Sequence, residues 1–187
     1  MDLLELDRTA IDRTTALVAA LDPEHYDLPT PCAGWTVRDV VRHLVDMAIQ
    51  YDAGARDGKP RARISDDLVA AYMAAGDLVT GSFRAEGFLD RDALLPGFGT
   101  HPGRNLVGAH LVDTVVHSWD LARALGRDGV VEDDLALVAY QVARRYPDTP
   151  DVRGPGAAFA SPVDVAEDAP TTDRLVALLG RSPDWRP

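Results

Sequence analysis

The stretch LVGAHLVDTVVHSWDLARALG, residues 106–126, decides the fold class of this chain. Its apolar side chains recur at the intervals of an α-helix, and Gly126 stands in the usual helix-terminating position. No other helical segment of the sequence is as apolar, and such a segment is typical of a helix that packs against several others. The sequence therefore predicts a helical protein built around this segment.

The same periodicity predicts further helices on both sides of this segment. They cover residues 2–21, 36–54, 65–83, 132–146 and 173–179. Thr36 and Asp39 have the spacing of a helix cap and an acid in the first turn, and Gly180 stops the last helix. Two stretches rich in Pro or Gly, 22–35 and 87–105, are predicted as long ordered loops, which are often functional in compact domains.

These elements predict an all-α protein with one domain over residues 1–187. The expected architecture is an antiparallel four-helix bundle with extra short helices and an irregular C-terminal tail. The sequence contains no internal repeat and no low-complexity tract.

Composition excludes several classes of protein. The chain has 187 residues, 46% of them apolar, a formal net charge of −11 and one cysteine. The acidic balance opposes nonselective nucleic-acid binding, and a single cysteine cannot form an internal disulfide. The acidic N-terminus is unlike a secretory signal, and no apolar run reaches the roughly 18 residues that span a bilayer. We therefore expect a cytoplasmic protein with neither a nucleic-acid nor a membrane partner.

Three residues of the apolar segment, His110, Asp113 and His117, have chemistry suited to a metal site. Their spacings of three and four place them within an arc of about 60° on one helix face, and Asp120 continues the stripe. Imidazole nitrogens and carboxylate oxygens are common ligands of Zn and similar divalent ions. Asp113 and His117 can present two ligands to one ion, and His43 on the helix over 36–54 can supply a third.

The same residues have a structural alternative. A stripe of His and Asp can be the solvated face of a helix, and a lone His43 can be a satisfied interior histidine. The absence of Lys, Arg and Glu from the stripe, and its extension by Leu106 and Ala124, favour a buried position. Spacing alone leaves both interpretations open.

Other catalytic motifs are absent from the sequence, including the Walker loop, the dinucleotide glycine fingerprint, HEXXH and GXSXG. Cys32 precedes a predicted helix start, where the helix dipole can lower the pKa of a thiol; alternatively it is a small buried apolar side chain. Trp35 and Trp119 are predicted as core aromatics.

Two segments of the chain resemble the paired signatures of the DinB-like superfamily. They are TPCAGWTVRDVVRHLVDM, residues 30–47, and DTVVHSWDLARALG, residues 113–126. They are most similar to the mycothiol-dependent maleylpyruvate isomerase N-terminal-like metal-binding proteins. The ending APTTDRLVALLGRSPDW, residues 169–185, resembles the C-terminal segment of that group. The resemblance implies a divalent metal ion, commonly Zn or Ni, held by His43, Asp113 and His117.

The resemblance also implies a metal-dependent thiol enzyme. Its partners would be a low-molecular-weight thiol such as mycothiol and a small electrophilic substrate, joined by S-transfer or isomerised from cis to trans. The loops 22–35 and 87–105 would shape the pocket. His110 is a candidate general base, and His110 and Asp46 are spare candidates for positions at or behind the metal. The fold is also compatible with a homodimer.

The chain departs from the isomerase in two respects. Asp113 stands where the isomerase has Glu, and 187 residues leave no room for its further C-terminal domain. The resemblance thus favours a related thiol reaction over maleylpyruvate isomerisation itself. One alternative is a non-catalytic metal or small-ligand binding protein on the same bundle. The other is a purely structural or interaction bundle with a solvated His stripe.

Overall fold

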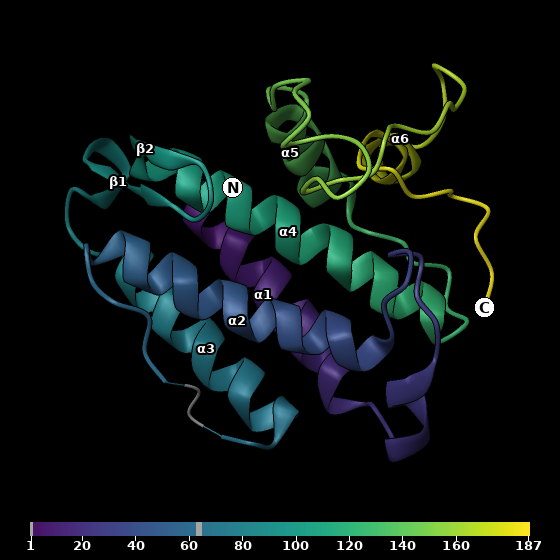
Figure 1. Cartoon of the computed structure of the whole chain (residues 1–187), viewed down its shortest axis with the longest axis horizontal. Helices are drawn as coiled ribbons and strands as arrows, with labels where there is room; N and C mark the ends of the chain where they lie inside the picture. Colours follow the sequence, from purple (N-terminus) through teal and green to yellow (C-terminus); the bar gives the residue numbers. More distant parts are fainter. Residues whose placement is uncertain (1, 63–64) are drawn as a thin grey trace.

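The computed structural model describes residues 2–62 and 65–187, and within them the chain is mostly helical (Figure 1). The elements follow in this order: α1 (Leu3–Ala19), the 3-10 helix η1 (Pro23–Asp27), α2 (Val37–Ala55), α3 (Leu68–Phe83), the 3-10 helix η2 (Phe88–Asp90), β1 (Asp92–Leu95), β2 (Gly99–Pro102), α4 (Gly103–Ala124), α5 (Asp133–Ala143) and α6 (Thr171–Leu178). None of these helices has the length and apolar character to cross a membrane.

Helix boundaries follow from local chemistry. The Thr36 side chain accepts a hydrogen bond from the Asp39 backbone N–H, and the Asp39 side chain accepts one from the Thr36 N–H, so the predicted cap of α2 is confirmed. Asp67 caps α3 in a similar way through the backbone N–H of Ala70. Past the end of α4, Gly126 has a φ of 69°, the left-handed conformation that terminates helices.

Helix α4 lies at the centre of the packing. The helices α1 and α2 each contact both α3 and α4, while α5 packs on α4 and α6 packs on α5 (Figure 1). Among the described residues, buried apolar side chains form two clusters, and α4 contributes Leu106 to one and Trp119 to the other. A helix covered on two sides has to be apolar over most of its surface, which explains the composition of residues 106–126.

The segment 87–105 differs from the long loop predicted for it. It contains η2 and an antiparallel β1–β2 hairpin in which Asp92 pairs with Pro102 and Leu95 with Gly99. Helix α4 then begins at Gly103, where a Cβ would lie 2.0 Å from the Phe88 carbonyl oxygen, so that only glycine fits. The prediction of a purely α-helical chain is therefore corrected to a mostly helical chain with a small two-stranded sheet.

The segment 22–35 is an ordered loop, as predicted, but it includes the 3-10 helix η1, which Pro23 begins. Beyond α5, α6 is the only helix within residues 144–187 of the described chain. The rest of that C-terminal segment is irregular, as predicted, and Figure 1 shows it lying over α4 beside α5 and α6.

Candidate metal centre

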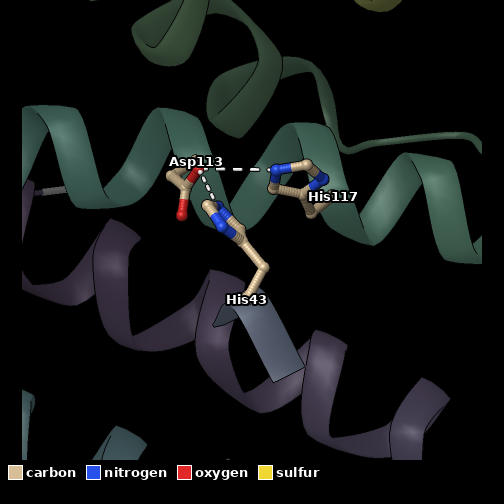
Figure 2. Close-up of side chains that lie close together, drawn as sticks. All are labelled: His43, Asp113 and His117. Atoms are coloured by element: carbon tan, nitrogen blue, oxygen red, sulfur yellow. Dashed lines mark hydrogen bonds and ion pairs between the residues drawn. The ribbon is translucent and has the colours of Figure 1, made fainter. Parts of the chain in front are cut away.

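The three predicted ligands come together between α2 and α4. His43 projects from α2, and Asp113 and His117 project from successive turns of α4 (Figure 2). The Nε2 atom of His43 lies 3.2 Å from Asp113 Oδ1, and the Nε2 atom of His117 lies 3.5 Å from the same oxygen. One ligand atom from each residue lies within 4.8 Å of the other two. Such a group can converge on one ion.

A second carboxylate fixes the orientation of His117. Its Nδ1 lies 2.9 Å from Asp120 Oδ2, and Arg181 donates to the same oxygen over 3.0 Å. Because Asp120 is paired with Arg181 and its pKa is held low, it is ionised and accepts a hydrogen bond from the Nδ1–H of His117. When the ring is neutral, its lone pair is on Nε2 and faces Asp113. This carboxylate–histidine arrangement is the usual support of a metal-binding imidazole.

The Asp113 carboxylate is ionised and incompletely paired. Burial raises its pKa, but the hydrogen bond with His43 and the charges of His117 and His43 outweigh burial and lower the pKa to about 2. Its Oδ2 atom is buried and has no hydrogen-bond partner among the residues that the structure describes. A buried anionic oxygen without a partner is costly. A divalent cation bound to this carboxylate would compensate its charge, so the residues fit such an ion.

The pKa of His43 shifts in the direction expected beside this carboxylate. Burial lowers it, but the hydrogen bond and the charge of Asp113 raise it by more, and the net shift is upward. The histidine and the carboxylate therefore stabilise each other when no cation is bound.

Trp35 belongs to this site, although the sequence predicted it as a core aromatic. Its indole ring is half-buried and stacks on the His117 ring, with centroids 5.7 Å apart and planes 6° apart. It also meets the His43 ring at 5.0 Å edge to face. The Trp35 carbonyl accepts hydrogen bonds from the N–H and hydroxyl of Thr30, which hold the loop in place. Trp119 is 2% exposed and is a core residue, as predicted.

A cavity of about 1050 Å³ adjoins the cluster, and all three candidate ligands line it. Both long segments singled out in the sequence contribute: 22–35 through Cys32 and Trp35, and 87–105 through the hairpin turn. The segment 142–159 also lines the cavity, and no pattern in the sequence indicated this. The prediction that the two loops shape the pocket is confirmed.

Of the two alternatives for Cys32, the one with a lowered pKa is wrong. The thiol is half-buried at the cavity, and burial raises its pKa to about 11. The small apolar alternative describes this side chain better.

His110 lies apart from the three candidate ligands. Its Nδ1 lies 2.7 Å from Asp7 Oδ1 on α1, and its ring meets the edges of Tyr51 and Phe83. Asp46, the other spare candidate, is exposed on α2 outside the group of three. The geometry gives His110 a place between α1 and α4, and a catalytic role for it stays a prediction.

The stripe on α4 is not a solvated face. His110 and His117 are each 4% exposed and Asp120 is fully buried. The alternative of a solvated His stripe is therefore wrong.

Two residues of this arrangement, Asp7 and Arg181, were missed in the sequence. Asp7 stands in a helix pattern with no motif around it. Arg181 is 61 positions from Asp120, and only its place directly after the helix-ending Gly180 distinguishes it. Neither residue has a spacing that points to its partner.

Comparisons with known proteins show the family of the chain. Residues 8–122, which include all three candidate ligands, match the family described as the mycothiol maleylpyruvate isomerase N-terminal domain. Two Mycobacterium tuberculosis proteins, "Uncharacterized protein MT0763" of strain CDC 1551 / Oshkosh and "Uncharacterized protein Rv0738" of strain ATCC 25618 / H37Rv, are each 35% identical to the chain over 183 residues. The alignments cover 97% of this chain and 99% of each relative. No solved structure matches the chain significantly. The chain thus belongs to the mycothiol maleylpyruvate isomerase N-terminal domain family.

Proposed function

We propose that the protein binds one divalent metal ion through His43, Asp113 and His117 and uses it in a thiol-dependent reaction of a small electrophile. The observation that carries the proposal is the convergence of two imidazole nitrogens and an ionised carboxylate, one oxygen of which is buried without a partner, on the wall of a large cavity. The reaction is S-transfer or a cis/trans isomerisation.

The donor set favours Zn or Ni. Neutral imidazoles are borderline ligands that suit these ions, and a carboxylate joins two histidines in many zinc sites. Three protein ligands leave a coordination position for a small molecule from the cavity. A divalent cation stabilises thiolate over thiol, which is the chemistry the ion would supply here.

The residues of the chain have separate tasks in this proposal. Asp120 holds the Nδ1 proton of His117 and so keeps the Nε2 lone pair directed at Asp113. Trp35 covers one face of the His117 ring. Residues of the segment 142–159 line the cavity and would limit the access of water to a bound thiolate.

The family description names mycothiol, and we propose mycothiol as the thiol. The proposal extends to the setting of the protein: a DinB-like four-helix bundle made by α1 to α4, a cytoplasmic location that keeps the thiol reduced, and a homodimer as its assembly.

Metal content tests the first half of the proposal. Tag-free protein should contain about one Zn or Ni per chain. His117→Ala should lose the metal, whereas His25→Ala, which removes a histidine of η1 outside the cluster, should keep it. A parent protein that stays metal-free after incubation with Zn and Ni would overturn the proposal.

Thiol dependence tests the second half. Metal-loaded protein should convert an electrophile only when the thiol is present, and His117→Ala should not. Metal binding without thiol binding or conversion would instead favour the non-catalytic metal-binding alternative.

A further inference from the structure

Aromatic and apolar side chains make up much of the cavity lining beside the candidate ligands. Tyr146 and Phe159, from the segment after α5, stack with ring centroids 5.8 Å apart and planes 16° apart. Trp35 and Phe98 add rings from the two long segments before α2 and α4. Rings gathered around one cavity favour a ligand with a flat apolar surface.

The cationic side chains of the lining are either paired or exposed. Arg181 is buried, but its guanidinium donates to Asp120 over 3.0 Å. Arg104 is exposed and forms an ion pair with Asp90, and Arg145 is exposed. An anionic group inside the cavity would lose its hydration without gaining an uncommitted buried cation from the described lining. The lining therefore favours a neutral ligand.

The size of the cavity allows two molecules. At about 1050 Å³ it lies at the upper end of small-molecule sites, which are roughly 300–1,000 Å³. A thiol near the candidate ligands leaves space for a ring system beside Tyr146 and Phe159.

We propose that the cavity binds a neutral aromatic small molecule, held by Tyr146, Phe159 and Trp35, and that this molecule is the electrophile of the thiol reaction. The identity of the electrophile rests on the proposed function; the aromatic site itself does not. In a transfer, the thiolate sulfur bonds to an electrophilic carbon of the aromatic molecule. The displaced group leaves with the electrons of its broken bond, and the thiol proton passes to water.

A matched pair of fluorescent probes tests the binding site in full-length, metal-free protein. N-phenyl-1-naphthylamine is neutral, and 1-anilinonaphthalene-8-sulfonate has the same rings with a sulfonate added. Fluorescence titration should give the neutral probe a Kd about tenfold lower than that of the sulfonate, because the cavity offers the sulfonate no buried counter-charge.

Substitutions locate the probe. Tyr146→Ala and Phe159→Ala should each raise the Kd of the neutral probe about fivefold or more, because each removes a flat contact surface. If Phe159→Ala does not fold, the Kd of the neutral probe is measured on Phe159→Leu, which keeps the site apolar. Tyr26→Ala removes a ring of η1 outside the cavity lining and should change the Kd by less than about twofold.

Two outcomes would overturn the proposal. One is tighter binding of the sulfonate that Arg145→Gln abolishes, since this would assign the cavity to an anionic ligand. The other is neutral-probe binding that the Tyr146 and Phe159 variants leave unchanged. None of these titrations uses metal or thiol, so they remain informative if the proposed function fails. Conversely, thiol activity restricted to non-aromatic electrophiles would refute the assignment of the electrophile alone.

Discussion

Asp120 illustrates how a single side chain supports the candidate ligands without contacting the ion. It is fully buried, and burial raises its pKa, but Arg181 and His117 outweigh burial and keep it ionised. An anion behind an imidazole makes the opposite nitrogen of the ring a stronger electron donor. In the proposed metal centre, this support would act on the affinity for the ion.

Replacing this carboxylate should weaken metal binding. Asp120→Asn keeps the shape but removes the charge, and we expect metal affinity to fall by about 10–100-fold. Competition with a coloured chelator measures this affinity. Asp12→Asn, an exposed acid of α1 paired with Arg8, is the control and should leave affinity unchanged. Equal affinities for the two variants would show that Asp120 has no role in metal binding.

Trp35 should report on the metal directly. Its ring stacks on His117, so a quenching ion such as Co²⁺ or Ni²⁺ at the site should reduce its fluorescence. Titration of the metal-free protein should give saturable quenching that Trp35→Phe removes and Trp185→Phe preserves. Quenching that survives Trp35→Phe would place the ion elsewhere.

The sequence predicted Asp113 and His117 as a pair because both lie on one helix, where spacing fixes their relative position. It offered His43 as a third ligand on an expected facing helix, and the family resemblance supported that choice. Asp7 and Arg181 could not be predicted, because their contacts depend on how separate segments pack, and no local pattern encodes that. Trp35 was predicted as a core residue because a sequence does not distinguish an aromatic side chain that fills a core from one that lines a cavity.

At the scale of elements, a buried ion pair joins α1 to α4. Burial lowers the pKa of His110, but the charge and hydrogen bond of Asp7 raise it by more, so the net shift is upward from 6.5. A raised pKa in the folded state means that the folded protein binds the proton more tightly than the unfolded chain. The stabilisation is therefore complete below pH 6.5 and is lost as pH rises through the folded pKa.

This linkage predicts how His110 contributes to pH-dependent stability. In metal-free protein, the free energy of unfolding of the parent should decrease relative to that of His110→Gln as pH rises from 5.5 to 8.5. Urea unfolding at several pH values measures the difference. His25→Ala should retain the pH dependence of the parent. A constant difference between parent and His110→Gln would exclude the proposed titration.

A second buried carboxylate joins α2 to α3. Asp52 accepts a hydrogen bond from Ser82 over 2.6 Å and pairs with Arg56 and Arg61. Asp52→Asn weakens its hydrogen bonds to these donors and should cost about 2 kcal/mol of unfolding free energy in urea. Asp77→Asn breaks an exposed pair with Arg8 and should cost less than about 1 kcal/mol. If the two variants lost similar amounts of unfolding free energy, the burial of Asp52 would not account for its contribution to stability.

The helices were predictable as elements, whereas the β1–β2 hairpin was not. Periodicity and caps located the six α-helices of the described residues to within a few positions. Residues 92–102 lack an alternating apolar pattern and carry four turn-forming residues, Pro96, Gly97, Gly99 and Pro102. Pairing between β1 and β2 depends instead on support from α2 and α4, which both contact β1. Local sequence patterns do not encode tertiary contacts of this kind.

At the scale of the whole molecule, the candidate site draws on more of the chain than the family match covers. The match ends at residue 122, yet Arg181 pairs with Asp120 and the segment 142–159 lines the cavity. The relatives that align over nearly the full chain therefore offer a natural comparison for this C-terminal contribution.

Removing the metal should lower the stability of the whole protein. An ion that binds the folded state alone stabilises it by about 2.7 kcal/mol when its concentration is 100 times Kd. Chelation should therefore lower the Tm of the parent, and added Zn should restore it. His117→Ala should show neither change, and an identical response in this variant would assign the effect to another site.

The placement of the candidate ligands also gives the ion a topological role. His43 and Asp113 are 70 positions apart in the sequence, so an ion held by both closes a long loop of the chain. Unlike a disulfide, such a link exists only in the folded state, because the ion leaves when the chain unfolds. A protein with one cysteine has no such covalent option. The bound ion would thus be its removable crosslink, governed by metal supply instead of redox state.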